Sequence, residues 1–149
     1  MKIIYAGNRS FALSSLGAKL KEELCVFAIK NSFLEEYALA NEYECHQFSS
    51  KASLYELLKK IKKKTLFISC GVPFKIDIEK FPFIAFVNIH PSLLPHLKGR
   101  DPAIGLLMKG GELGITIHQM TMDIDSGFFL WQSNPIKVDI EMNIKDIYS

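Results

Sequence analysis

The sequence predicts an α/β protein, and two observations lead to that prediction. Short apolar runs with strand character alternate along the chain with segments in which leucines recur at helical spacing. The runs end at Gly or Pro, which interrupt regular structure. Taken in order, the expected elements read βαβαβαββαββ, which indicates a mostly parallel sheet covered by helices and a final third richer in strands.

The first apolar run, residues 2–6, ends at Gly7 and predicts a strand followed by a turn. Ser10 is a favourable helix cap, and the segment after it is expected to be helical. Residues 25–29 are again continuously apolar and predict the second strand. The helical expectation rests on apolar side chains at mixed spacings of three and four, namely Phe11, Leu13, Leu16, Leu20 and Leu24.

Ser32 is expected to cap a helix over residues 33–41, in which Glu35 and Glu36 lie near the positive end of the helix dipole. Residues 44–48 predict a weak strand. Residues 53–64 predict a helix whose buried stripe comprises Leu54, Leu57, Leu58 and Ile61.

Residues 65–70 predict a strand ending at Gly71, and residues 83–87 predict the next one. Pro102 favours the first turn of a helix over residues 103–109. Residues 114–120 and 128–132 then predict two further strands. Residues 143–149 have the pattern of the first turns of a helix, so the chain is expected to end within a helix.

The composition restricts the class of protein. The chain has 149 residues, of which 48% are hydrophobic, so it is expected to form one folded domain over residues 1–149 rather than a disordered chain. A net charge of +2 gives no reason to expect attraction to nucleic acid or membranes. Three cysteines without CxxC spacing suggest reduced thiols and a cytoplasmic location. No apolar run is long enough to span a bilayer, and the first run is too short for a signal peptide.

The most informative segment follows the strand predicted at residues 83–87. Asn88 and His90 come directly before Pro91, at which sheet pairing is expected to stop. Because these residues are two apart on an extended chain, their side chains share one face at the carboxyl end of a strand, the edge where α/β sheets bind ligands. An imidazole can relay a proton, and an amide can stabilise an oxyanion. Alone, such a pair is more often a satisfied polar cluster at the edge of a sheet.

A second polar segment lies between the last two predicted strands. It contains Asp123 and Asp125, and it could bring a carboxylate to His90 across the carboxyl edge of the sheet. A metal site built on the two aspartates has little support, because neither His nor Cys lies nearby at ligand spacing. His118, on the preceding strand, is interpreted as a structural partner or as indirect support for the site.

These segments resemble a known family. Residues 88–95, Asn-Ile-His-Pro-Ser-Leu-Leu-Pro, followed by Gly99, are similar to the signature of the folate-dependent formyltransferases. That family includes glycinamide ribonucleotide, methionyl-tRNA and sugar N-formyltransferases. Residues 124–127, downstream of residues 114–118, resemble the second signature, and residues 5–12 resemble the first strand and helix of the family. The resemblance implies a Rossmann-like formyltransferase domain, with a mostly parallel twisted sheet and helices on both faces.

The resemblance also implies an activity and its residues. The family transfers a formyl group from 10-formyltetrahydrofolate, its co-substrate, to an amine, and no metal is expected. The catalytic Asn, His and Asp correspond to Asn88, His90 and Asp125. The folate-contacting positions correspond to two loops, in which the expected residues are Gly71, Phe74 and Ile76 and then Met122, Asp123 and Ile124. Phe128-Phe129 departs from the proline-containing continuation of the family.

The acceptor amine stays open between alternatives. Residues 98–102 resemble the sugar N-formyltransferases, which favours an amino sugar linked to a nucleotide. The start of the chain resembles the methionyl-tRNA enzyme, and a glycinamide ribonucleotide acceptor is a further alternative. A different class of function is a shortened, catalytically weak remnant that binds folate or a protein partner. A missing packing helix would expose an apolar face and favour homo-oligomers. The lysines of residues 59–64 are interpreted as a solvated helix end rather than a nucleic-acid site.

Overall fold

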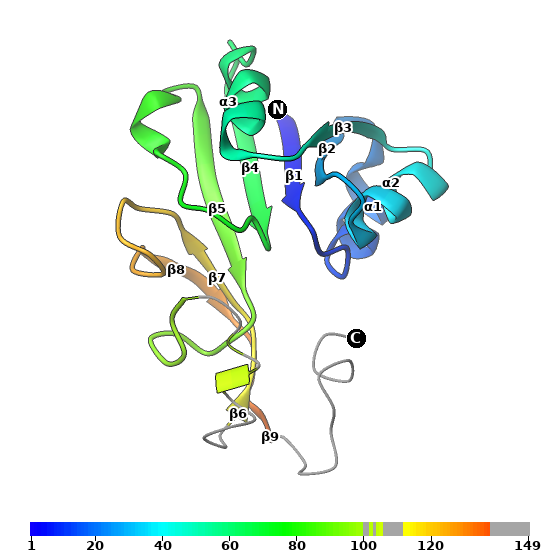
Figure 1. The fold of residues 1–149 in the computed structure, drawn as a ribbon. Helices are drawn as coiled ribbons and strands as arrows, with labels where there is room; N and C mark the ends of the chain where they lie inside the picture. Colours follow the sequence, from blue (N-terminus) through cyan, green and yellow to red (C-terminus); the bar gives the residue numbers. More distant parts are fainter. Residues whose placement is uncertain (100–101, 103, 106–111, 138–149) are drawn as a thin grey trace. The chain divides into compact units, whose positions relative to one another are not determined.

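In the computed structural model, residues 1–99, 102, 104–105 and 112–137 are described (Figure 1). The chain divides into two compact units, Met1–Val87 and Asn88–Ser149. Strand β5 (Ile84–His90) begins in the first unit and ends in the second. Most of the helix predicted at residues 103–109, and all of the helix predicted at residues 143–149, lie outside the described residues.

The first unit alternates strands and helices as predicted. Its elements before β5 are β1 (Lys2–Gly7), α1 (Leu13–Leu20), the 3₁₀ turn η1 (Lys21–Glu23), β2 (Leu24–Ile29), α2 (Phe33–Ala40), β3 (Glu44–Phe48), α3 (Lys51–Lys59), β4 (Thr65–Cys70) and the 3₁₀ turn η2 (Ile78–Lys80). Every strand predicted here is present, and the observed bounds differ by a few residues at most.

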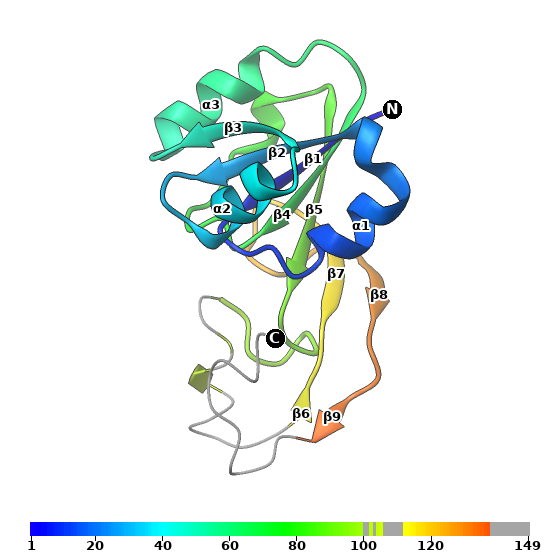
Figure 2. The same cartoon turned by 90° about the vertical axis from the view of Figure 1, so that its right-hand side faces the viewer.

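The strand order in the first unit is β3-β2-β1-β4-β5, and the pairs β3–β2, β2–β1 and β1–β4 are parallel. Crossovers between parallel strands are right-handed, so the reversal of direction after β3 places α3 on the opposite face from α1 and α2. Figure 2 shows this arrangement, with α3 on one side of β1 to β3 and α2 on the other. The predicted fold class, a mostly parallel Rossmann-like sheet with helices, is confirmed.

The core of the first unit follows from the continuous apolar strands. A parallel sheet covered on both faces buries residues of both alternations, and β1 and β2 have almost no exposed position. Each helix contributes one apolar stripe to this core. Fully buried side chains in these stripes include Leu13 of α1, Leu34 of α2 and Leu54 of α3. Where β1 ends, Gly7 has a φ of 139° and a Cβ there would lie 1.9 Å from the Cys70 carbonyl oxygen, so only glycine fits.

Serine caps account for the starts of α2 and α3, two of the three α-helices in the first unit. The Ser32 hydroxyl accepts a hydrogen bond from the Glu35 amide at 3.3 Å, as predicted for α2. Ser50 caps α3, so this helix begins before residue 53, and Ser50 and Ser53 satisfy each other's amides. Ser10, by contrast, does not cap α1, because that helix begins at Leu13 after Ala12 and has no side-chain cap.

Helix α3 is shorter than the sequence predicts, because it ends at Lys59 rather than residue 64. The amides of Lys60 and Ile61 bond three residues back, which tightens the last turn. Continuing the helix would place Lys59 near Lys63 and Lys60 near Lys64, and like charges four residues apart are destabilising. The predicted buried stripe is therefore reduced to Leu54 and Leu58, with Leu57 and Ile61 half-buried.

The second unit is built from the end of β5 and from antiparallel strands. Its strand order is β5-β7-β8, and β7 (Thr116–Gln119) pairs with β8 (Phe129–Gln132) across an irregularity at Ile117 and His118. A separate small ribbon joins β6 (Glu112–Leu113) to β9 (Ile136–Lys137). The prediction of a final third rich in strands is confirmed, although the strand predicted at residues 114–120 is shorter as β7 and neither β6 nor β9 was predicted.

In the part of the chain that the structure describes, no helix has both the length and the apolar character needed to cross a membrane.

Candidate active site

The end of β5 supplies two of the predicted site residues. Asn88 is half-buried and His90 is buried, with 4% of its surface exposed. Their separation of two residues on a strand places both side chains on the same face, as the sequence predicted. Both belong to the second unit, and so do their side-chain partners Leu97, His118 and Asp125.

The third predicted site residue, Asp125, lies in the loop between β7 and β8. Asp125 has a φ of 50°, a left-handed conformation that Asp tolerates better than most residues. The loop folds back closely on β7, because a Cβ on Gly127 would lie 1.7 Å from the Gln119 carbonyl oxygen. The Gln119 amide donates to the Phe128 carbonyl at 2.9 Å and closes this loop.

The structure brings the three predicted side chains together. Asn88 Nδ2 donates to Asp125 Oδ1 at 3.5 Å, and His90 Nδ1 lies 3.6 Å from Asp125 Oδ2. The Asp125 carboxylate therefore lies within ion-pair reach of the imidazole and within hydrogen-bond reach of the amide. An amide, an imidazole and a carboxylate that converge in this way can stabilise an oxyanion and move a proton.

A second imidazole completes the cluster. His118 Nε2 lies 3.4 Å from Asp125 Oδ1 and 3.2 Å from Asn88 Nδ2. His118 is only 2% exposed, so it is a buried partner of Asp125 rather than a surface residue. From the sequence, His118 was predicted to be a structural partner or an indirect support for the site, and the structure places it in contact with Asn88 and Asp125.

Backbone carbonyls fix which nitrogen of each ring carries a proton. His90 Nε2 lies 3.0 Å from the Leu97 carbonyl, and His118 Nδ1 lies 3.0 Å from the Gln119 carbonyl. A carbonyl oxygen only accepts, so each of these nitrogens is the donor. The other nitrogen of each ring faces Asp125. When both rings are neutral, their lone pairs face a carboxylate, and an added proton converts this repulsion into an ion pair.

The Asp125 carboxyl is held in its charged form by its neighbours. Burial raises its pKa, but the hydrogen bond from His118, the Gly99 amide and the charge of His90 together lower the pKa below its ordinary value. The Gly99 amide donates to Asp125 Oδ2 at 2.8 Å. A buried carboxylate with these donors is a stable anion and a fixed electrostatic partner for the two imidazoles.

The loop after β5 contributes through its backbone, which sequence reasoning could not foresee. Leu97 has a φ of 54° and offers its carbonyl to His90, and Gly99 has a φ of 95° and offers its amide to Asp125. Lys98, between them, donates to the Ser126 hydroxyl at 3.0 Å. The sequence marked this loop through residues 88–95, Gly99 and residues 98–102, but those motifs did not predict the backbone contacts.

A buried hydroxyl ties this loop to the strands. Thr116 Oγ1 accepts from the Leu94 amide at 3.0 Å and donates to the Ser92 carbonyl at 2.6 Å. Gln132 Nε2 donates to the same hydroxyl at 2.9 Å and to the Leu94 carbonyl at 2.8 Å. Thr116 is fully buried, so this network fixes the start of the loop that positions Leu97 and Gly99.

Next to Asp125 the surface opens into a cavity of about 310 Å³, lined by Lys98, Asp125, Ser126, Gly127, Phe128 and Phe129. Within it, Asp125 is the buried acid and Lys98 supplies a cation. A small polar group could therefore reach the carboxylate from solvent.

The residues predicted to contact folate fall into two groups. Met122, Asp123 and Ile124 precede Asp125 in the loop of the second unit, where Ile124 is 60% exposed. The other three lie after β4 in the first unit and differ in their exposure. Gly71 and Phe74 are half-buried, whereas the Ile76 side chain is 1% exposed, so only its backbone is available to a ligand.

Comparison with known proteins tests the family resemblance of this chain. The model of the formyl transferase family (Formyl_trans_N) matches residues 78–149, which include Asn88, His90 and Asp125. Proteins named methionyl-tRNA formyltransferase are 36% identical over 85 residues in Borrelia recurrentis and 31% identical over 147 residues in Blochmanniella pennsylvanica. These matches support the prediction, made from the sequence resemblance, that the chain is a member of the formyl transferase family.

These two relatives are longer than this chain. The alignments cover 55% of this chain and 27% of the Borrelia protein, and 87% of this chain and 45% of the Blochmanniella protein. The chain therefore spans between about a quarter and about a half of the length of the curated relatives that it matches.

Solved structures agree with the fold. The sugar 3N-formyl transferase WlaRD, solved with dTDP and 5-N-formyl-THF, has a TM-score of 0.76 at 25% identity, over 99% of this chain and 56% of that one. Phosphoribosylglycinamide formyltransferase from Streptococcus pneumoniae TIGR4 has a TM-score of 0.76 at 22% identity, over 99% of this chain and 88% of that one. The second likeness supports the fold alone.

Proposed function

We propose that this chain transfers a formyl group from 10-formyltetrahydrofolate to a primary amine, and that Asn88, His90 and Asp125 carry out the transfer. The observation that carries the proposal is the convergence of an amide and an imidazole on one buried carboxylate, at 3.5 and 3.6 Å. The match to the model of the formyl transferase family supports the same reaction.

The co-substrate would supply an activated formyl carbon, which the amine attacks to form the new C–N bond. Negative charge then develops on the formyl oxygen. The Asn88 amide, with His90 nearby, is the donor suited to stabilise it, and one such donor contributes ~10²–10³ in turnover. Asn88 is half-buried, so its amide is still accessible to a substrate oxygen.

The amine must also lose a proton after the attack. His90 Nδ1 and His118 Nε2 both face the Asp125 carboxylate, so a proton delivered there is shared by three groups and neutralises their repulsion. Asp125 is ionised at neutral pH because its pKa is lowered, despite burial, by His118, Gly99 and His90. The proton then passes to the tetrahydrofolate nitrogen as the bond from that nitrogen to the formyl carbon breaks.

For the folate itself, we propose contacts to Met122, Asp123 and Ile124 of the second unit, whereas the contacts expected of Gly71, Phe74 and Ile76 in the first unit stay a prediction from the sequence resemblance. The exposed Ile124 side chain and the half-buried Met122 side chain are suited to an aromatic ring system. The buried Ile76 side chain restricts that residue to a backbone contact. The described side chains at these positions include no metal-ligand set, and the proposal uses no metal.

For the acceptor, we propose an amino sugar linked to a nucleotide. The likeness to a sugar 3N-formyl transferase across 99% of this chain supports this choice. Methionyl-tRNA is the second candidate, because the curated relatives matched over most of this chain bear that name. The acceptor is part of this proposal, and a direct assay tests it.

The assay offers the purified chain 10-formyltetrahydrofolate with three acceptors in parallel: a dTDP-linked amino sugar, methionyl-tRNA and glycinamide ribonucleotide. Mass spectrometry identifies the formylated acceptor, and absorbance follows tetrahydrofolate. We expect formylated amino sugar with the wild type, and loss of product with Asn88→Ala, His90→Ala and Asp125→Ala. If methionyl-tRNA is the only acceptor that is formylated, the proposed acceptor is wrong but the proposed reaction stands.

Absence of product with every acceptor, in a folded chain that binds a folate analogue, would reject the enzyme and support a folate-binding remnant. Equal activity of the three variants and the wild type would reject the assigned residues.

A further inference from the structure

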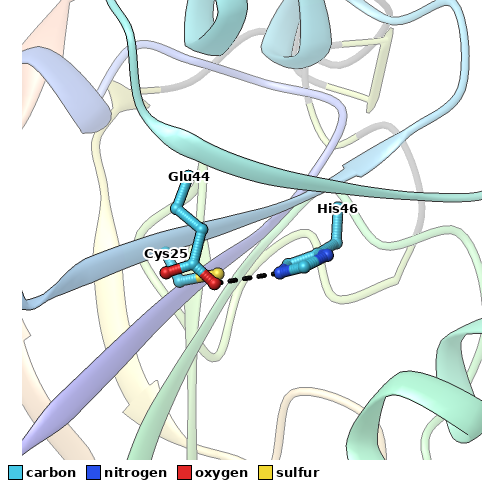
Figure 3. Close-up of side chains that lie close together, drawn as sticks. All are labelled: Cys25, Glu44 and His46. Carbon is cyan, nitrogen blue, oxygen red and sulfur yellow. Dashed lines mark hydrogen bonds and ion pairs between the residues drawn. The ribbon is translucent and has the colours of Figure 1, made fainter.

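A second group of reactive side chains lies in the first unit, on the sheet edge formed by β2 and β3. In the parallel register, Cys25 is the partner of Glu44, and Phe27 is the partner of His46. Because alternate residues of a strand share a face, Cys25, Glu44 and His46 point to the same side of the sheet. Figure 3 shows the thiol, the carboxylate and the imidazole side by side.

The donor atoms of these three residues are close enough to share one ion. Cys25 Sγ, a Glu44 carboxylate oxygen and a His46 ring nitrogen all lie within 4.8 Å of one another, and His46 Nε2 lies 3.0 Å from Glu44 Oε1. A tetrahedral zinc site, with bonds of about 2.0–2.3 Å, needs roughly 3.3–3.7 Å between ligand atoms. Modest side-chain rotations bridge the difference.

The burial pattern allows those rotations where they are needed. The Glu44 and His46 side chains are 55% and 46% exposed, so both can adjust towards an ion. Cys25 is fully buried in the sheet, so its sulfur cannot move as freely as the Glu44 and His46 side chains. An ion bound here has three protein ligands on one side and solvent on the other.

We propose that Cys25, Glu44 and His46 form a zinc-binding site on the β2–β3 edge, with a fourth position open to water. Thiolate and imidazole are ligands that select zinc over magnesium and calcium, which prefer oxygen. The three protein ligands and one open position resemble the coordination of exposed, solvent-accessible zinc sites rather than of closed structural ones. None of the three residues belongs to the transfer site proposed above.

Two other interpretations account for less of the arrangement. A nucleophilic thiol needs a low pKa, but burial, together with the Glu44 charge, raises the pKa of Cys25 to about 12. A simple surface ion pair explains Glu44, His46 and Lys2, but it does not explain a thiol lying against the same carboxylate.

The surroundings suit a bound ion. Lys2 Nζ lies 3.4 Å from both carboxylate oxygens of Glu44, so one oxygen can keep this partner while the other binds metal. The Phe27 ring packs edge-on against the His46 ring, with centroids 5.6 Å apart and an interplanar angle of 89°, which restrains the imidazole.

The test uses the full chain without an affinity tag, freed of metal by a chelator. Zinc binding is measured by competition with a chromophoric chelator, and Co²⁺ is then used as a spectroscopic probe. We expect one zinc per chain. We also expect the Co²⁺ form to show the strong visible bands of a tetrahedral site together with a thiolate-to-metal charge-transfer band in the near ultraviolet.

The variants identify the ligands. His46→Asn and Glu44→Gln alter exposed side chains and should weaken zinc binding by at least ~10–100-fold. Losses of that size are typical even for residues that only hydrogen-bond to a metal ligand. Cys25→Ser should remove the charge-transfer band. Cys45→Ser is the matched control, because Cys45 lies between Glu44 and His46 on β3 and faces the other side of the sheet.

Stoichiometric zinc binding that survives both His46→Asn and Glu44→Gln would overturn the proposal, and so would a Co²⁺ spectrum without a thiolate band. Failure to bind zinc in a chain with native circular dichroism would overturn it as well. If Cys25→Ser does not fold, the spectrum of the wild type and the two exposed variants still decide the result.

Discussion

Among the residues that the structure describes, two clusters bring a carboxylate against an imidazole, and they differ in their surroundings. In the second unit, Asp125 is 8% exposed and lies between His90 and His118. In the first unit, the Glu44 side chain is 55% exposed and pairs with His46 and Lys2. The pKa of Glu44 is lowered by the His46 hydrogen bond, and that of Asp125 is lowered by His118 and Gly99 against the effect of burial.

The difference shows what burial adds to the same chemical groups. At the exposed cluster, water screens the charges and the side chains can move, so the arrangement is weak and adaptable. At the buried cluster, the ring nitrogens of both histidines and both carboxylate oxygens of Asp125 have partners, among them the Leu97 carbonyl and the Gly99 amide. The buried cluster is therefore preorganised for chemistry, whereas the exposed cluster is suited to capturing an ion.

The largest expected effect is on catalysis by the buried carboxylate. Asp125→Asn preserves the size of the side chain but removes the charge that accepts the proton, so we expect formyl transfer to fall by ~10²–10⁴-fold. Initial rates measure this loss, with the acceptor that the assay described above identifies. Glu56→Gln, which neutralises an exposed carboxylate on α3, is the matched control and should retain full activity. An Asp125→Asn variant with nearly wild-type turnover would contradict the assignment.

The next effect compares two buried threonines, one in each unit. Thr116→Val removes a hydroxyl that bonds Leu94, Ser92 and Gln132, and leaving buried groups without partners costs about 1–3 kcal/mol each. We therefore expect the free energy of unfolding to fall by at least ~2 kcal/mol. Thr65→Val removes a hydroxyl that donates to the Lys63 carbonyl, and it should cost about 1 kcal/mol.

Urea unfolding followed by circular dichroism measures both variants under the same conditions. Equal losses for the two threonines would show that the Thr116 network adds nothing beyond a single hydrogen bond.

A smaller effect is expected on the acid stability of the two clusters. The folded-state pKa of Asp125 is lowered, so its contribution to stability is present above the unfolded pKa of about 4 and is lost as the pH falls through the folded value. From about pH 5 to pH 3, the wild type should lose more free energy of unfolding than Asp125→Asn. Glu44→Gln should change this pH dependence less, because solvent screens Glu44. The opposite ranking in urea titrations at several pH values would refute the comparison.

The smallest effect is expected at the exposed imidazole. In metal-free buffer, His46→Asn should change the free energy of unfolding by less than about 1 kcal/mol, because exposed ion pairs contribute little. Adding zinc should stabilise the wild type but not the variant. Thermal unfolding with and without zinc measures both. A large loss in metal-free buffer would mean that His46 is part of the packing of the first unit.

Several elements could be predicted from local sequence because their causes are local. The strand ending in Asn88 and His90 followed from an apolar run stopped by proline, and the start of α2 followed from Ser32 as a cap. The errors also have local causes. Ser10 had the chemistry of a cap but not its geometry, and the lysines after Lys59 stopped α3 earlier than the apolar spacing indicated.

The remaining features of the buried site depend on residues far apart in the chain. His118 reaches Asp125 only because the loop after β7 turns back on its own strand, which no spacing rule predicts. Gln132 reaches the Leu94 carbonyl across 38 positions. Likewise, the Cys25–Glu44–His46 group depends on the register of β2 against β3, and register was not predictable from two short apolar strands.

The sequence by itself determined the order of strands and helices, the family resemblance, and the chemical identity of an amide, an imidazole and a carboxylate, because periodicity and motifs are written in neighbouring residues. Only the tertiary structure decided which second imidazole and which backbone groups surround Asp125, and which thiol lies beneath Glu44. Those contacts are set by strand register and loop closure, which bring together atoms that the chain order separates.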